Sequence, residues 1–259
     1  MNKKVIYTSL VGKYDELKQP LAINDEYDYI CFSNDFAEER IGVWQIRKIP
    51  YSHPDATRHS RYVKLLPHKA LPEYDYSVWI DSNLCITTND FYTAIEKQIQ
   101  KKSLIAQVPH VKPPMDCIYD EIKYAFKLTV VGFFEARKQY RHLKQEGFPA
   151  HYGLFENNII ARFHNDELVK KISEEWWDEY LAYTRRDQFS LMFIYWKNNF
   201  KPSLIFGPSI NSSNAACIKY TPHIRILSKI TVKTVMKSIR KNSVKAVKLA
   251  LNKILIHFI

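Results

Sequence analysis

The chain has 259 residues, enough for one large domain or two small ones, and its 46% hydrophobic residues can form a sizeable core. No run of about 18 or more uncharged apolar residues occurs, so we expect no membrane-spanning helix. The four cysteines lie far apart without paired spacing, which argues against a zinc cluster and indicates a reducing compartment.

The net charge of +11 is distributed unevenly along the chain. Residues 188–259 contain 12 of the 38 Lys and Arg residues and none of the 27 Asp and Glu residues. Residues 1–187 are therefore almost neutral, with a balance of −1. The basic character belongs to the C-terminal segment, so we expect no nucleic-acid binding by the whole domain.

Predicted strands and helices alternate along most of the chain, which is typical of an α/β layered domain. Asp55, Asn89 and Asn165 stand where the N-caps of predicted helices would fall. Neither G-x-G-x-x-G nor G-x-x-x-x-G-K-[ST] is present, which argues against a dinucleotide fold and a P-loop ATPase. We expect strands at Lys4–Leu10, Tyr29–Ser33, Trp44–Ile49, Tyr76–Ile80, Leu104–Val108, Leu154–Phe163 and Leu204–Phe206. We expect helices at Ala56–Leu66, Asp90–Lys101 and Asp116–Phe126, between Gly132 and Gly147, from the cap at Asn165 to about Tyr183, and from about Arg186 through the aromatic run that follows.

The segment Tyr74–Thr88 contains an apolar, aromatic run that ends abruptly at Asp81, Ser82 and Asn83. The run itself is typical of a buried strand. Because an unpaired buried charge is costly, we expect Asp81 at the carboxyl edge of a sheet, where open α/β sheets bind their ligands. The alternative is an ordinary transition from strand to turn, since Asp, Ser and Asn all favour turns.

Asp81 and Asn83 form an Asp-X-Asn variant of an Asp-X-Asp arrangement, which can hold a hard divalent cation together with a diphosphate. We therefore predict that Asp81 and Asn83 bind Mn²⁺ or Mg²⁺, with Ser82 beside them in a nucleotide-sugar site. The cation would neutralise charge on a departing nucleoside diphosphate. His223 follows the last predicted strand and is the candidate third ligand, although a lone His is more often structural.

Arg58, Arg61 and Lys64 are spaced three residues apart on a predicted helix and share one face. They are candidates for binding the donor diphosphate, because Arg can hold phosphate through two hydrogen bonds. The alternative is a solvated helix face.

The end of the first predicted strand supplies Thr8, Gly12, Tyr14 and Asp15 as a candidate wall for a nucleotide base and its ribose. An aromatic ring can stack on the base, and a carboxylate can accept hydrogen bonds from ribose hydroxyls. The alternative is an ordinary strand-to-loop turn.

Glu156 and Asp187 are the candidate catalytic carboxylates. Glu156 interrupts an otherwise apolar strand, where a surface role is difficult to argue, and Asp187 opens an aromatic helix, where an N-cap is the competing role. A carboxylate at either place would deprotonate an acceptor hydroxyl while the anomeric carbon passes through an oxocarbenium-like state.

An ordered set of short motifs covers roughly residues 4–200 and resembles a glycosyltransferase-like family long catalogued as a domain of unknown function. That family occurs in bacterial polysaccharide gene clusters and in plant cell-wall and mucilage proteins. The matching motifs are Y-T-S-L-V-G-K-Y-D (Tyr7–Asp15), Y-I-C-F-S-N-D (Tyr29–Asp35), R-H-S-R-Y-V-K-L-L-P-H (Arg58–His68), V-W-I-D-S-N (Val78–Asn83), D-C-I-Y-D-E (Asp116–Glu121), G-L-F-E-N-N-I-I-A-R-F-H (Gly153–His164) and R-D-Q-F-S (Arg186–Ser190).

The resemblance implies a GT-A-like fold, in which helices flank a Rossmann-type mixed sheet, and sugar transfer from a nucleotide-sugar donor. We expect a UDP-sugar as that donor. Gln188, next to Asp187, is assigned to the donor site by analogy with retaining GT-A enzymes.

The last part of the chain, Ser228–Ile259, combines Lys and Arg at three- and four-residue steps with apolar residues between them. A cationic amphipathic helix can lie in an anionic membrane interface, and the alternative is a solvated helix that packs its apolar side on the domain. We therefore divide the chain into a glycosyltransferase domain, residues 1–227, and a basic amphipathic tail, residues 228–259.

The leading hypothesis is an enzyme that is cytoplasmic and peripheral on the inner face of the cytoplasmic membrane. Its acceptor would be a polysaccharide or a lipid-linked glycan. The alternatives are a metal-dependent nucleotidyltransferase or phosphohydrolase, and a basic adaptor that binds membrane or nucleic acid without catalysis. Deleting residues 228–259 would separate an adaptor from an enzyme.

Overall fold

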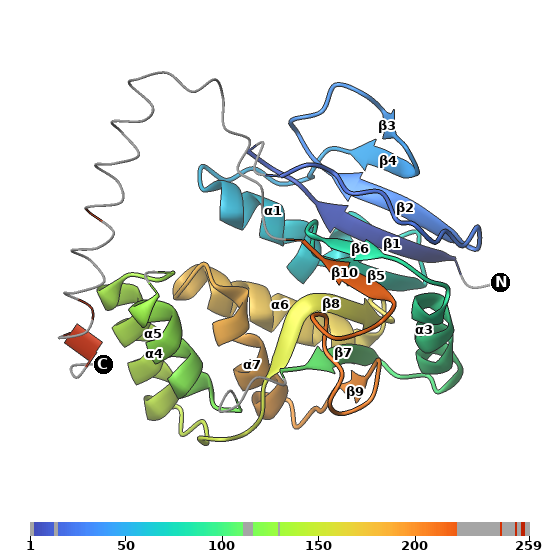
Figure 1. Cartoon of the computed structure of the whole chain (residues 1–259). Coiled ribbons are helices and arrows are strands. Elements are labelled where there is room, and N and C mark those ends of the chain that lie inside the picture. The colour runs from blue at the N-terminus through green and yellow to red at the C-terminus, as the bar shows by residue number, and fades with distance from the viewer. Residues whose placement is uncertain are drawn as a thin grey trace.

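The structure is a computed structural model that describes residues 3–12, 15–110, 116–128 and 130–221, together with residues 244, 252, 255 and 256. Helices surround a central sheet, and a small two-stranded sheet lies beside it (Figure 1). In chain order the elements are β1 (Lys4–Ser9), β2 (Tyr27–Phe32), β3 (Arg40–Ile41), β4 (Trp44–Arg47), α1 (Ala56–Leu65), α2 (Pro67–Ala70), β5 (Tyr76–Ile80), β6 (Leu84–Ile86), α3 (Asp90–Gln100), β7 (Ile105–Pro109), α4 (Ile118–Lys127), α5 (Phe133–Gln145), β8 (Phe155–Arg162), α6 (Glu167–Ala182), the 3-10 helix η1 (Asp187–Phe189), α7 (Leu191–Lys197), β9 (Ser203–Leu204) and β10 (Ile218–Tyr220).

The central sheet has eight strands in the order β3-β4-β2-β1-β5-β8-β7-β9. β1 pairs in parallel with both β2 and β5, whereas β8 runs antiparallel to β5 and β7. β6 and β10 form the small antiparallel sheet. The predicted mixed sheet flanked by helices is confirmed.

Side chains of β1 alternate between two hydrophobic cores, one on each face of the sheet. Val5 and Tyr7 belong to the core that α1 and α4 to α7 cover, and Ile6 belongs to the opposite core with α3, β6 and β10. This alternation follows from the period of two along a strand. Both faces are buried, which explains why β5 reads as a continuous apolar run.

The predicted N-cap positions were right at Asp55 and Asn89 and wrong at Asn165. The Asp55 side chain accepts from the backbone N–H groups of Thr57 and Arg58 at the start of α1, as expected. Asn89 stands before α3 but makes no capping hydrogen bond with its side chain. The cap of α6 is Asp166 rather than Asn165, whose side-chain amide instead donates to the Tyr74 carbonyl.

The helix predicted from Arg186 onward is divided in two. η1 is a single 3-10 turn, and α7 follows after Ser190. The short elements β3, α2, β6 and β10 were not predicted, and each has at most four residues. None of the helices in the described part of the chain is long and apolar enough to cross a membrane.

Candidate functional site

A cavity of about 380 Å³ opens where the parallel strands β1 and β5 end. Carboxyl ends of adjacent parallel strands are where open α/β sheets bind ligands. The first turns of α1 close one side of this cavity, and the residues that follow β5 close another. Its lining residues are Ser9, Leu10, Val11, Gly12, Ala56, Thr57, Ser60, Arg61, Trp79, Asp81 and Ser82.

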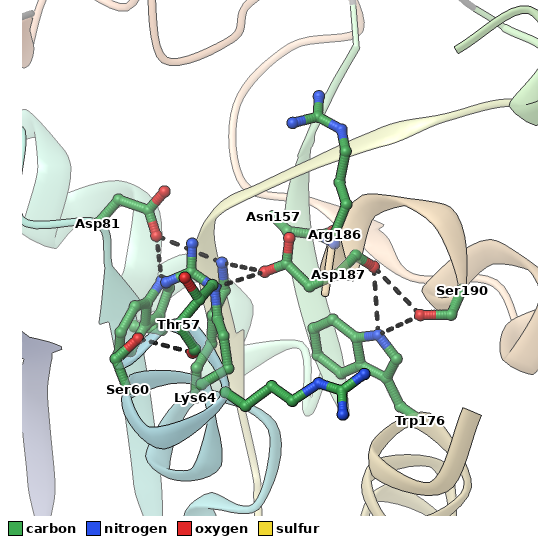
Figure 2. Close-up of polar contacts among 12 residues, drawn as sticks. Thr57, Ser60, Lys64, Asp81, Asn157, Trp176, Arg186, Asp187 and Ser190 are labelled. Carbon is green, nitrogen blue, oxygen red and sulfur yellow. Dashed lines mark hydrogen bonds and ion pairs between the residues drawn. The ribbon is translucent and has the colours of Figure 1, made fainter. Parts of the chain in front are cut away.

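Asp81 follows β5 directly and lines the cavity, where the sequence placed it. Its Oδ1 accepts hydrogen bonds from Trp79 Nε1 at 2.7 Å and from Lys64 Nζ at 3.3 Å. Figure 2 shows its other carboxylate oxygen pointing away from both donors. The turn is held by backbone bonds instead, since the Asp81 carbonyl accepts from the Leu84 N–H. The carboxylate is therefore not used to cap its own turn.

Lys64 joins two carboxylates that are far apart in the sequence. Its side chain is only 1% exposed, and its Nζ lies 2.6 Å from Asp187 Oδ2 as well as beside Asp81 (Figure 2). Arg61, one turn earlier on α1, places its Nε 3.4 Å from the same Asp187 oxygen. Two cations and two carboxylates thus form a largely buried, charge-balanced cluster, of which Arg61 and Asp81 line the cavity. This balance limits the cost of burying each charge.

The local backbone fixes Asp187 at the start of η1. Trp176 Nε1 on α6 donates to the Asp187 carbonyl at 3.3 Å and to Ser190 Oγ at 3.1 Å (Figure 2). Burial alone would raise the pKa of the Asp187 carboxyl, but the facing charges of Lys64 and Arg61 lower it to about 2. Asp187 is therefore an anion at neutral pH and a weak proton acceptor, and its carboxylate is not used as a helix cap.

Glu156 lies in a neighbouring polar network rather than in the lining of the cavity. Its oxygens accept from Asn211 Nδ2 at 2.8 Å, Ser212 Oγ at 2.6 Å and Asn158 Nδ2 at 3.1 Å. Asn158 also links this network to Asp81, because its carbonyl accepts from the Asp81 N–H at 2.9 Å. The structure thus brings Asp81, Lys64 and Asp187 into contact. Glu156 is connected to them through Asn158.

The candidates on the first strand are separated by the structure. Gly12 lines the cavity with a φ of +82°, a conformation that favours glycine, and its N–H donates to the Asp35 carboxylate. Thr8 is buried and does not contribute to the lining, and Asp15 is buried as well. Tyr14 lies outside the described residues.

The remaining candidates are placed as follows. Ser82 lines the cavity, whereas Asn83 is buried and its carbonyl accepts from the Thr221 N–H and hydroxyl. Gln188 Nε2 donates to the Phe155 carbonyl. Arg58 is half-buried on α1 and is not among the lining residues. His223, the candidate third metal ligand, lies outside the described part of the chain.

Arg162 is a residue of the site region that the sequence analysis missed. It is buried at the end of β8 and donates from Nη2 to the Tyr7 hydroxyl at 2.6 Å and to the Lys64 carbonyl at 2.7 Å. It therefore supports the backbone that carries Lys64. The signal was present, because a charged residue closes an apolar strand, as Glu156 opens one.

A second ion pair connects the site to the α4–α5 helices. Arg186, immediately before Asp187, donates to the carboxylate of Glu121 on α4, which is buried. Tyr119, in the same motif, donates its hydroxyl to the Phe148 carbonyl at 2.6 Å within the core. The motif around Glu121 therefore positions α4 against η1.

Comparison with known proteins gives relatives among glycosyltransferases. The probable hexosyltransferase MUCI70 of Arabidopsis thaliana is 26% identical over an alignment of 221 positions, which covers 73% of this chain and 36% of that protein. The chain thus spans about a third of the length of this relative.

Two solved glycosyltransferase structures are similar to this chain at lower sequence identity. The WbbM bifunctional glycosyltransferase has a TM-score of 0.43 and 12% identity over 80% of this chain and 39% of its own. Mouse xyloside xylosyltransferase 1 has a TM-score of 0.40 and 10% identity over 78% of this chain and 83% of its own.

The family model of the TOD1/MUCI70 glycosyltransferase-like domain matches residues 1–208, which include the cavity lining and all four residues of the charged cluster. The chain belongs to the TOD1/MUCI70 glycosyltransferase-like domain family.

Proposed function

We propose that this chain transfers a sugar from a nucleotide-sugar donor, a UDP-sugar in the first instance, to a polysaccharide or lipid-linked glycan acceptor. The observation that carries the proposal is the cavity at the ends of β1 and β5, with Asp81 on its wall and the Lys64–Asp187 pair behind it. The acid-free C-terminal segment supports action at the inner face of the cytoplasmic membrane.

The cavity suits the diphosphate part of a donor. Its volume of about 380 Å³ falls in the range of small-molecule sites, roughly 300–1,000 Å³. Arg61 lines it, and a guanidinium can hold phosphate oxygens through two parallel hydrogen bonds. Gly12 leaves open space beside the end of β1, since a Cβ there would meet no atom within 4 Å. The base and ribose would lie along this open edge.

A divalent cation fits this site only with a large share of its ligands coming from the donor. Asp81 offers one carboxylate oxygen, because its Oδ1 is already bonded to Trp79 and Lys64. Asn83 is buried outside the cavity lining. A Mn²⁺ or Mg²⁺ ion held by Asp81 and the diphosphate would supply charge neutralisation at the leaving group. The group of ligand-type residues that lie close together, Cys117, Asp120 and His151, belongs to a different region around α4.

The two carboxylates support different roles. Asp187, with its low pKa, suits electrostatic stabilisation of positive charge that develops at the anomeric carbon rather than proton abstraction. Glu156 is oriented by Asn211 and Ser212 and is the candidate base for the acceptor hydroxyl. Lys64 holds the Asp187 and Asp81 carboxylates in position. When a donor enters, Arg61 leaves Asp187 and binds the phosphate.

The test is a donor screen followed by a matched pair of variants. Incubation with a panel of nucleotide sugars and Mn²⁺ should give release of one nucleoside diphosphate, and that diphosphate with Mn²⁺ should raise the melting temperature. Asp81→Ala should lower kcat by at least about a hundredfold, because it removes charge stabilisation at the leaving group. Lys64 keeps its pair with Asp187 in this variant, so the protein should remain folded.

Asp178→Ala is the control, since Asp178 is exposed on α6 and is not among the residues that line the cavity. It should leave turnover unchanged. Full turnover in Asp81→Ala, or an unchanged melting temperature over the whole nucleotide and metal panel, would contradict the proposal. Release of phosphate alone would indicate a phosphohydrolase instead.

A further inference from the structure

One face of α5 presents a basic stripe with an exposed aromatic residue at its start. Phe134, Arg137, Lys138 and Arg141 are spaced by three and four residues, so they lie on one side of the helix. Together with His142, Gln145 and Tyr183 they line a groove of about 410 Å³. The lining contains three permanent cations and no carboxylate.

Two of the acidic residues near this groove, Glu135 and Glu179, have other partners, whereas Glu146 follows the lining residue Gln145 and its charge acts on Tyr183. Glu135 accepts from the Gly132 N–H at 3.3 Å, and Glu179 accepts from Gln139 Nε2 at 3.1 Å and lies beside His142. Lys138 is held at the edge of the groove, because its Nζ donates to the Ala182 carbonyl at 2.9 Å. Arg137 and Arg141 are therefore left to meet an anion that enters the groove.

Exposed apolar side chains occur on α5 and on the neighbouring helix α4 and the residues after it. Phe134 is 82% exposed, and Tyr124, Leu128 and Val130 on and after α4 are about half exposed. Large exposed apolar residues grouped within a few turns are unusual on a soluble surface and mark an interaction site. Over residues 123–144 the sequence has six Lys and Arg residues and a single acid. An aromatic and aliphatic tip surrounded by cations complements an anionic lipid surface.

We propose that the α4–α5 pair is a membrane-docking surface, with the α5 groove binding the phosphate of an anionic lipid headgroup and Phe134 entering the interface. Arg137 and Arg141 would meet the phosphate, and Phe134, Leu128 and Val130 would contact the upper acyl region. This assignment concerns the folded domain and is separate from the predicted role of the basic tail.

Two observations connect this surface with the rest of the molecule. Asn252, near the C-terminus, donates to the Phe126 carbonyl on α4 at 2.7 Å, and Leu255 and Ile256 pack against the same core, so the end of the basic segment reaches this helix (Figure 1). Tyr183, on the groove, lies just four residues before Asp187. The groove and the charged cluster therefore share neighbouring residues in the sequence.

The experiment measures binding of the full chain to vesicles, without donor, so that it is independent of sugar transfer. Sedimentation with phosphatidylcholine vesicles containing phosphatidylglycerol should show binding, and vesicles of phosphatidylcholine alone should show little. Arg137→Gln with Arg141→Gln should weaken binding on the order of tenfold, since each cation near an anionic surface contributes appreciably. Phe134→Ser should weaken it severalfold, and both variants should keep the wild-type melting temperature.

The control variants remove side chains of the same kinds, cationic and apolar, from outside the α4–α5 surface. Lys101→Gln with Lys102→Gln takes two exposed cations from the end of α3, at the other end of the molecule, and Leu21→Ser removes an apolar side chain that is 73% exposed. Both should bind as the wild type does. The proposal is overturned if the α5 variants bind like the wild type, which would assign any binding to the tail, or if the control variants lose as much.

Discussion

At the scale of single residues, the site depends on one buried ammonium group shared by two acids. Lys64 lies 2.6 Å from Asp187 and 3.3 Å from Asp81, and its Nζ lies 5.2 Å from the centre of the Trp79 ring. Removing either acid leaves Lys64 one partner, whereas removing the lysine would take the shared cation from both acids and leave Asp187 with Arg61 alone. The arrangement therefore tolerates change at Asp81 better than at Lys64.

The lowered pKa of Asp187 predicts how this cluster responds to acid. A carboxyl whose pKa falls from about 4 in the unfolded chain to about 2 in the native state stabilises the fold above the unfolded value, and this stabilisation is lost as the pH falls from about 4 to 2. Asp187→Asn should lower the free energy of unfolding by several kcal/mol, roughly 3–5, at pH 7. The gap to the wild type should narrow by about 2 kcal/mol as the pH falls through that window.

Urea unfolding followed at a series of pH values measures this gap. Asp178→Asn serves as the comparison, because an exposed acid on α6 should give a small difference at every pH. A gap for Asp187→Asn that stays constant from pH 7 to pH 2 would mean that the carboxylate is not stabilised by Lys64 and Arg61.

At the scale of elements, α1 carries the two cations of the cluster and forms one side of the cavity. Its N-cap should therefore affect donor binding as well as stability. Asp55→Ala removes the side-chain bonds to the Thr57 and Arg58 N–H groups and should cost about 1 kcal/mol of unfolding free energy. The KM for the donor should also rise, because Ala56 and Thr57 line the cavity. Denaturant unfolding and donor titration measure the two effects.

Asn89→Ala is the matched control for the cap. Asn89 precedes α3 in the same position, but its side chain makes no capping bond, so its loss should change stability by less than about 0.5 kcal/mol. Equal losses in the two variants would show that the Asp55 bonds do not stabilise α1.

Most of the long helices and strands could be predicted from the sequence. Periodicity predicted β5, α1 and β8 closely, because buried strands and amphipathic helices carry their pattern within themselves. The cap of α6 was assigned one residue early, since Asn165 and Asp166 both have capping side chains and only the path of the backbone decides between them.

The site was less predictable than the fold, for a physical reason. A stripe of Arg and Lys on a helix is usually solvated, and Lys64 is buried only because Asp81 and Asp187, on separate segments, converge on it. Two of the three side-chain partners of Glu156, Asn211 and Ser212, likewise lie more than fifty residues away. Contacts of this kind leave no local pattern, so the sequence indicated which residues were unusual without indicating their partners.

At the scale of the whole molecule, the cavity and the α4–α5 surface lie on different parts of one domain, and the family match ends at residue 208. The contacts of Asn252, Leu255 and Ile256 place the end of the basic segment on α4, far along the chain from the cavity residues. We therefore expect truncation of the tail to weaken membrane binding without affecting turnover, an outcome that would distinguish an enzyme with a tail from an adaptor.

Deletion of residues 228–259 should therefore leave turnover on a soluble acceptor within about twofold of the wild type, because none of the cavity-lining residues is removed. The melting temperature should fall slightly, since Leu255 and Ile256 no longer cover part of the core. Binding to phosphatidylglycerol vesicles should weaken but persist, because the α5 cations remain. A truncated chain that is folded by circular dichroism yet has no turnover would place an essential group in the tail, and His223, which the truncation keeps, would not be that group.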